Sequence, residues 1–143
     1  MTPSKTVLTI DDDRTITGLI QARCEAMGLR SIVAHSIVHA ARYLDSQLPD
    51  LITFDVHMPP GNGLQLIKAL AEDPAASRIP VIVLTEQLSP QAVGACRRLC
   101  AYYMIKSEGF WTRLEPVIHE LVEIDGGTRR RASRGSRESH KLD

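Results

Sequence analysis

Five short runs of apolar and β-branched residues limit this chain to one class of fold. Each run is four or five residues long and is typical of a buried strand. The runs are 6–10, 31–34, 51–54, 81–84 and 102–105. The segments that follow them carry apolar residues at helical spacing. Strands that alternate with helices predict an α/β fold, in which a parallel sheet has helices on both faces.

Polar caps, glycine and proline indicate where the helices begin and end. Asp13 and Ser36 suit the N-caps of the first two helices, and Gly28 suits the end of the first. The third helix follows residue 63 and stops before residue 74, and Pro90 fits the first turn of a fourth helix that reaches residue 99. The last helix is expected over 110–124 and contains Pro116. This proline either lies in the first turn of a helix that starts late, or kinks the helix.

Length and charge predict one domain with a basic tail. A chain of 143 residues has the size of a single domain. Basic and acidic residues number 17 each, but residues 126–143 hold six basic and two acidic residues among Gly and Ser. Such a segment has too few apolar residues to pack. We therefore expect a folded domain over 1–125 and a disordered basic tail over 126–143.

The cysteines and the apolar runs indicate a cytoplasmic protein. Cys24, Cys96 and Cys100 lack the spacing of a disulfide framework, as is typical of reduced thiols. The chain has no signal-peptide core, and no apolar run approaches the ~20 residues of a membrane span, so no membrane partner is expected. The pairs Cys96/Cys100 and His35/His39 have helical spacing. Packing or surface positions are expected for both pairs, because structural zinc needs four ligands.

Chemically active side chains follow four of the five expected strands. Asp11 and Asp12 follow the first strand, Asp55 the third, Thr85 the fourth and Lys106 the fifth. The carboxyl ends of parallel strands meet at one edge of the sheet, where open α/β sheets bind ligands. Carboxylates gathered there need a cation, and oxygen ligands with a few waters suit Mg²⁺. A lysine and a hydroxyl suit phosphate oxygens, so the set predicts phosphoryl transfer with an aspartate as nucleophile.

In these motifs the sequence resembles the response regulator receiver domain of two-component signalling. The resemblance covers about residues 5–124, and the motifs match in order and spacing. They are VLTIDDD at 7–13, FDVHMP at 54–59 with Gly63, VLT at 83–85 and YMIK at 103–106. The resemblance implies a flavodoxin-like (βα)₅ doubly wound parallel sheet with strand order 2-1-3-4-5. With a basic tail too short for an output domain, it also implies a stand-alone receiver.

The resemblance implies a role for each carboxylate at the strand ends. Asp55 would be the phosphoacceptor, charged from a phosphohistidine on a sensor histidine kinase or a phosphotransfer protein. Asp12, Asp55 and the backbone carbonyl of His57 would bind Mg²⁺. Asp11 would act on the ion largely through water.

The remaining site residues are implied to bind the phosphoryl group and to transmit its presence. Thr85 and Lys106 would bind phosphoryl oxygens. Tyr103 matches an aromatic switch that turns inward when Thr85 moves to the phosphoryl group. This two-state change would signal to a downstream protein effector. The chain would thus be a signalling domain and not an enzyme, although it would assist its own phosphotransfer and autodephosphorylation.

The chain departs from the receiver pattern at three points. Ser107 stands where receivers usually have proline. A non-proline cis bond costs about 2.5–4 kcal/mol, so we expect a trans bond after Lys106 and a reshaped loop from Ser107 to Phe110. Glu86 replaces a small residue, and its longer charged side chain is expected to slow loss of the phosphoryl group. Residues 99–102 are more apolar than usual, which favours a partner or a homodimer on the face made by the fourth helix, fifth strand and fifth helix.

The residues leave other functions to be weighed. A pseudo-receiver that binds partners without phosphate is compatible with Ser107 and Glu86, although the complete Asp, Thr and Lys set argues against it. A phosphatase of the haloacid dehalogenase type needs an aspartate where His57 stands. Three aspartates after the first strand repel phosphate, and no Gly-rich turn follows, which disfavours nucleotide binding. Arginine-rich tails can hold nucleic acid, but a solubilising or docking tail is expected here.

Overall fold

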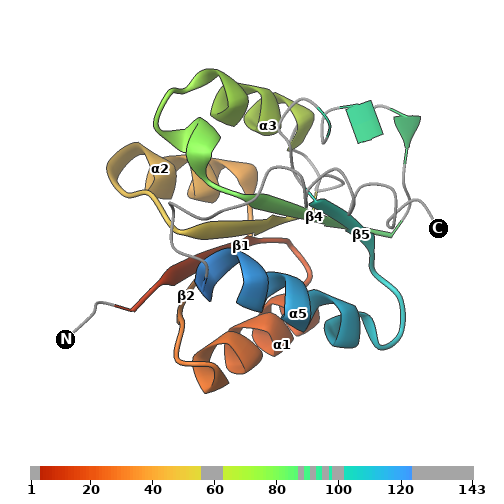
Figure 1. Cartoon of the computed structure of the whole chain (residues 1–143). Helices are drawn as coiled ribbons and strands as arrows, with labels where there is room; N and C mark the ends of the chain where they lie inside the picture. Colours follow the sequence, from red (N-terminus) through yellow and green to blue (C-terminus); the bar gives the residue numbers. More distant parts are fainter. Residues whose placement is uncertain are drawn as a thin grey trace.

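Five parallel strands form one sheet at the centre of the molecule (Figure 1). The computed structural model describes residues 4–55, 63–86 and 102–123, together with positions 89, 90, 93, 94 and 97. The strands are β1 (Thr6–Ile10), β2 (Arg30–Ala34), β3 (Leu51–Phe54), β4 (Val81–Thr85) and β5 (Tyr102–Ile105). Their order is β2-β1-β3-β4-β5, which confirms the predicted topology.

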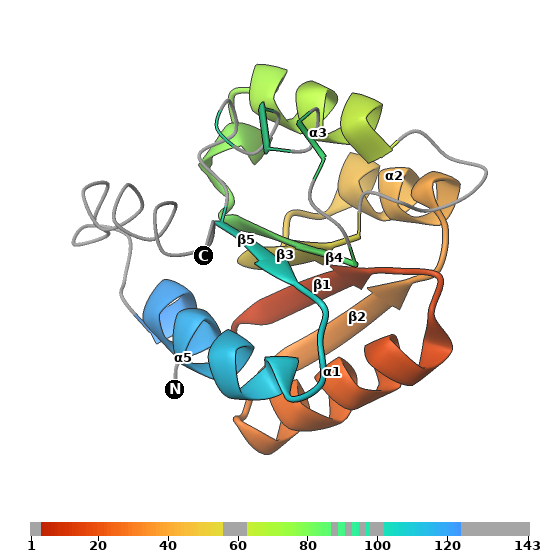
Figure 2. The same cartoon turned by 90° about the vertical axis from the view of Figure 1, so that its right-hand side faces the viewer.

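Helices cover both faces of the sheet (Figure 2). They are α1 (Arg14–Ala26), α2 (Ile37–Ser46), α3 (Gly63–Glu72) and α5 (Phe110–Glu123), with a 3₁₀ turn, η1 (Ala76–Arg78), that was not predicted. Figures 1 and 2 show α2 and α3 on one face and α1 and α5 on the other. Most of the expected fourth helix lies outside the described residues. Within the described part, no helix has both the length and the apolar character needed to cross a bilayer.

The predicted caps form at both ends of α1 and at the start of α2. The Asp13 carboxylate accepts hydrogen bonds from the backbone N–H groups of Thr15 at 2.9 Å and Ile16 at 3.1 Å. Ser36 Oγ accepts one from His39 N–H at 3.0 Å. Gly28 follows α1 with φ of 86°, a left-handed conformation that suits glycine at a helix end. An N-cap of this kind typically contributes about 1 kcal/mol.

Pro116 lies inside α5, which excludes a first-turn proline, the first of the two alternatives left open by the sequence. The helix begins at Phe110 because the preceding loop folds into a turn. Phe110 N–H donates to the Ser107 carbonyl at 2.9 Å, and Gly109 supplies a left-handed residue with φ of 76°. Pro116 has no N–H for the i→i−4 bond, yet the helix continues to Glu123, with Leu114 and Ile118 fully buried on its inner side.

The two faces of the sheet carry separate cores. Leu8, Ile52 and Val83 pack with the side chains of α2 and α3. Val7 and Leu51, which point the opposite way, pack with those of α1 and α5. Side chains alternate between the faces of a strand, so the strands of this doubly covered sheet are apolar almost throughout.

Candidate functional site

The backbone places Asp11 and Asp55 at neighbouring positions on the carboxyl edge of the sheet. Each residue extends the parallel hydrogen-bonding pattern one step past its strand. Asp11 N–H donates to the Ala34 carbonyl at 3.1 Å, and Asp55 N–H donates to the Ile10 carbonyl at 2.9 Å. Both side chains are nearly buried, with 2% of Asp11 and 6% of Asp55 exposed.

Asp12 joins these two residues to form an acidic cluster. Each of the three side chains offers one carboxylate oxygen, and these oxygens lie within 4.8 Å of one another. Asp12 is exposed, unlike its two partners. Asp13 belongs to the cap of α1, but its backbone N–H donates to Asp11 Oδ1 at 2.9 Å and so orients that carboxylate.

Lys106 supplies the positive charge that holds the buried carboxylates together. Its Nζ lies 2.7 Å from Asp11 Oδ2 and 2.9 Å from Asp55 Oδ2. The lysine follows β5 directly, and its backbone N–H donates to the Thr85 carbonyl at 2.8 Å. Residues from three strand ends therefore meet around one ammonium group, as the predicted topology required.

Burial and neighbouring charges shift the pKa values of Asp11 and Lys106. Burial raises the pKa of Asp11 above its usual value, and this outweighs the lowering by Lys106 and by the Asp13 N–H. Burial alone would lower the pKa of Lys106. The hydrogen bonds and charges of Asp11 and Asp55 oppose that effect and leave the pKa above its ordinary 10.5. The lysine is therefore a fixed cation at neutral pH.

The acidic cluster fits a hard divalent cation. Its ligands are carboxylate oxygens only, which suits Mg²⁺ better than zinc or copper. Mg²⁺ keeps several of its waters, and the exposed side of the cluster at Asp12 allows them. The third protein ligand implied by the resemblance to receiver domains, the backbone carbonyl of His57, lies outside the described residues.

Thr85 and Tyr103 lie on the same face of the sheet, the face covered by α2 and α3. Tyr103 pairs with Val83 in the register of β4 and β5, and both side chains belong to the core beneath α2 and α3. Thr85 follows Val83 by two residues and so shares that face. Both Thr85 and Tyr103 are fully buried, so the tyrosine is turned inward here.

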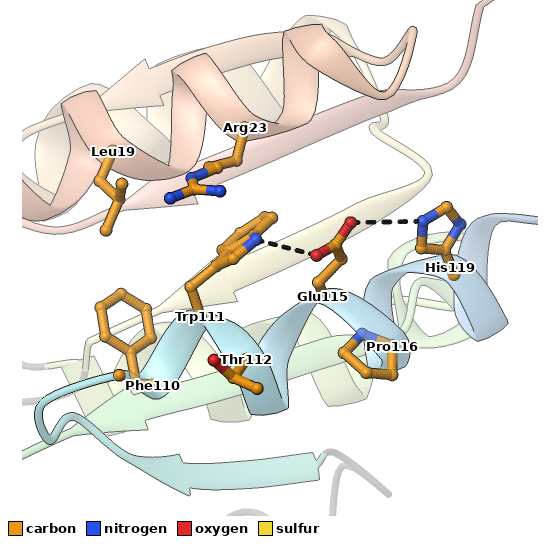
Figure 3. Close-up of a pocket in the computed structure, with 9 residues that line it drawn as sticks. Leu19, Arg23, Phe110, Trp111, Thr112, Glu115, Pro116 and His119 are labelled. Atoms are coloured by element: carbon orange, nitrogen blue, oxygen red, sulfur yellow. Dashed lines mark hydrogen bonds and ion pairs between the residues drawn. The ribbon is translucent and has the colours of Figure 1, made fainter.

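A groove between α1 and α5 lies apart from this cluster (Figure 3). It has a volume of about 670 Å³, and Trp111 forms part of its wall. The guanidinium carbon of Arg23 lies 5.8 Å from the centre of the Trp111 ring. Trp111 Nε1 donates to Glu115 Oε1 at 3.1 Å, and His119 lies 3.7 Å from the same carboxylate. No local pattern predicts the contact between Arg23 and Trp111, because the two residues are far apart along the chain.

The fold and the acidic edge define a doubly wound α/β domain with an acidic cluster at its carboxyl edge. The family model "Response regulator receiver domain" matches residues 7–108. The chain therefore belongs to the response regulator receiver domains, which are signalling domains of two-component systems. This confirms the resemblance stated from the sequence motifs.

Curated relatives support the same family. The transcriptional regulatory protein CpxR of Escherichia coli K12 is 40% identical over 79 residues, which cover 55% of this chain and 32% of CpxR. The phosphate regulon transcriptional regulatory protein PhoB of the same strain is 30% identical over 82 residues, which cover 57% of this chain and 36% of PhoB. The matched segments thus span about a third of the length of these relatives.

Solved structures share the fold. The receiver domain of a DNA-binding response regulator from Colwellia psychrerythraea 34H gives a TM-score of 0.76 at 25% identity, over 85% of this chain and all of that one. The response regulator TrrA of Thermotoga maritima, solved in complex with Mg²⁺-BeF, gives 0.71 at 23% identity over 82% of this chain and 99% of its own. The predicted flavodoxin-like fold is confirmed.

Proposed function

We propose that this domain is an active phosphoacceptor that receives a phosphoryl group on Asp55 from a phosphohistidine of a sensor histidine kinase or a phosphotransfer protein. The observation that carries the proposal is the position of Lys106 Nζ, within 2.9 Å of both Asp11 and Asp55. Burying three charges is expensive, and apolar residues of similar size often give a more stable core. A pseudo-receiver would gain nothing from this arrangement, whereas phosphoryl transfer uses every part of it.

The residues divide the chemistry between them. An oxygen of Asp55 attacks phosphorus as the bond from phosphorus to the histidine nitrogen breaks, and the imidazole leaves. Lys106 binds an oxygen of the transferred group, and the Thr85 hydroxyl donates to another. Asp12, Asp55 and the His57 carbonyl would hold Mg²⁺, and Asp11 would act on the ion through water. When bound, the ion neutralises charge on the carboxylates and the phosphoryl oxygens.

TrrA, which shares the fold of this chain, was solved in complex with Mg²⁺-BeF. The acidic cluster of this chain supplies the oxygen ligands that such an ion requires. These two observations are the support for Mg²⁺ as the cofactor of the domain.

The signal leaves the site through Thr85 and Tyr103. Thr85 lies two residues past Val83, the partner of Tyr103 in the register of β4 and β5, so the two residues share one face and a shift of Thr85 toward the phosphoryl group changes the packing beside Tyr103. A downstream protein effector then recognises the altered face that includes β5, where Ile105 is exposed. The same face is our candidate for homodimer formation. Residues 1–125 form the receiver in this proposal, and 126–143 form its basic tail.

Intact mass measured after incubation with Mg²⁺ and acetyl phosphate tests the proposal. The wild type should gain the mass of one phosphoryl group, and Asp55→Asn should gain none. Asp45→Asn, an exposed aspartate on α2, is the matched control and should behave as the wild type. Chelation of Mg²⁺ should abolish the gain. A folded wild type that takes no phosphoryl group would favour the pseudo-receiver.

A further inference from the structure

One arginine of α5 contacts the backbone on both sides of Lys106. Arg113 Nη2 donates to the Ile105 carbonyl at 2.9 Å and to Ser107 Oγ at 2.9 Å. Nη2 carries two N–H groups, so it can make both bonds at once. Ile105 and Ser107 are the immediate neighbours of Lys106 in the chain.

Other contacts attach the same segment to the sheet and to the helix. Lys106 N–H donates to the Thr85 carbonyl, and the Ser107 carbonyl accepts from Phe110 N–H. These bonds constrain the backbone from the side of the sheet and from the start of α5, and neither is made by a side chain. The guanidinium of Arg113 spans the interval from residue 105 to residue 107, and α5 gives it a firm base because Leu114 and Ile118 are fully buried.

We propose that Arg113, acting through Ser107 and the Ile105 carbonyl, is a positioning residue for Lys106. This inference deepens the proposed function and rests on it for its role in phosphoryl transfer. A lysine side chain is flexible and carries about 2 kcal/mol of rotamer entropy. Its ammonium group meets two carboxylates here only if the backbone at residue 106 is held in place. A displacement of about 1 Å in such a group can slow a reaction by about a hundredfold.

The contact depends on a residue where this chain departs from the receiver pattern. The acceptor at position 107 is a hydroxyl, and a proline there would offer none. The sequence alone did not reveal the pair, since Ser107 belongs to a loop and Arg113 is an exposed arginine of a helix. Arg113 and Ser107 therefore act together to hold the loop after β5 in place.

Amine labelling of Lys106 tests the positioning role without relying on phosphorylation. The folded full-length protein is treated with an acetylating reagent, and acetylation of each lysine is followed by peptide mass spectrometry. Lys106 should be acetylated about two- to tenfold faster in Arg113→Ala and in Ser107→Ala, as expected from the loss of one or two exposed hydrogen bonds. Lys68, which is exposed on α3, should be acetylated at an unchanged rate in both variants.

Controls separate positioning from general destabilisation. Arg42→Ala removes an exposed arginine on α2 and should leave Lys106 as in the wild type. Arg113→Lys should give an intermediate rate, and Ser107→Ala/Arg113→Ala should not exceed Arg113→Ala. If Lys106 is acetylated at the wild-type rate in both single variants, or if every lysine is accelerated alike, the positioning role is wrong.

Phosphorylation by acetyl phosphate links the positioning role to function. At saturating Mg²⁺ the Arg113→Ala variant should be phosphorylated about two- to tenfold more slowly than the wild type, with no change in its affinity for Mg²⁺. An equal rate in the two proteins would overturn the role in transfer. If the wild type is not phosphorylated although Lys106 labelling responds as expected, the proposed function fails and the positioning of Lys106 stands.

Discussion

Thr53→Val is expected to stabilise this domain, whereas Thr17→Val is expected to destabilise it. The two threonines are almost equally buried, with 1% and 3% of their surface exposed. Thr53 Oγ1 has no hydrogen-bond partner among the described residues. Thr17 Oγ1 donates to the Arg14 carbonyl at 3.2 Å and lies 3.2 Å from His35 Nε2. The same change of a hydroxyl to a methyl group is therefore expected to raise the stability of the fold at Thr53 and to lower it at Thr17.

The magnitudes follow from the cost of an unpaired hydroxyl. In protein mutants, burying such a group without a partner costs about 1–3 kcal/mol. Valine has nearly the same shape and suits a strand, so Thr53→Val should raise the free energy of unfolding by roughly 1 kcal/mol. Thr17→Val loses hydrogen bonds of about 0.5–1.5 kcal/mol each and should lower it by roughly 1 kcal/mol.

Urea unfolding measures the difference. The chain has one tryptophan, Trp111, which is buried between α5 and α1 and so reports unfolding by its fluorescence. With a urea m-value of about 2 kcal/mol/M, the two midpoints should move by roughly 0.5 M in opposite directions. Thr9→Val is a second instance, because Thr9 pairs with Thr53 in the register of β1 and β3 and also lacks a partner among the described residues.

The result that refutes this reasoning is a fall in the midpoint for both Thr9→Val and Thr53→Val. Such a fall would mean that the two hydroxyls are hydrogen-bonded in solution, for example to a buried water between β1 and β3. Circular dichroism and phosphorylation of Asp55 serve as controls, since Thr53 lies two residues before the phosphoacceptor.

Three further predictions concern charge, thiol chemistry and phosphate lifetime. Because the pKa of Lys106 lies above 10.5, its ion pairs with the two carboxylates stabilise the fold from neutral pH up to that value, and this contribution is lost as the pH rises through the folded-state pKa. Urea midpoints measured at alkaline pH should therefore fall less steeply in Lys106→Met than in the wild type, and equal slopes would contradict this. Burial raises the pKa of Cys24 to about 11, so its peptide should resist alkylation in the folded protein near neutral pH and react only in urea. Rapid alkylation of Cys24 in the folded protein would contradict this and would show that the packing of α1 against the sheet opens. Glu86→Ala should shorten the lifetime of the phosphoryl group on Asp55, measured by intact mass after the phosphodonor is removed, and a longer lifetime would reverse the role assigned to Glu86.

Local signals predicted the elements of the fold well. The apolar runs of the five strands and the caps at Asp13 and Ser36 act within a few residues, so they are readable from the chain alone. The start of α5 was harder to place. It depends on the turn from Ser107 to Phe110, whose left-handed residue at Gly109 is decided together with the packing of the helix.

The sequence by itself determined which residues meet. Parallel strands have their carboxyl ends at one edge, so the order of the strands brings Asp11, Asp55 and Lys106 together before any side chain is placed. Only the tertiary structure decided how they meet. Asp11 and Asp12 are identical neighbours, yet one is buried against Lys106 and the other is exposed. The hydrogen bonds from Arg113 to Ile105 and Ser107 depend in the same way on how α5 packs against the sheet. Burial, side-chain direction and ion pairing depend on the packing of distant elements, and no local pattern in the chain encodes that packing.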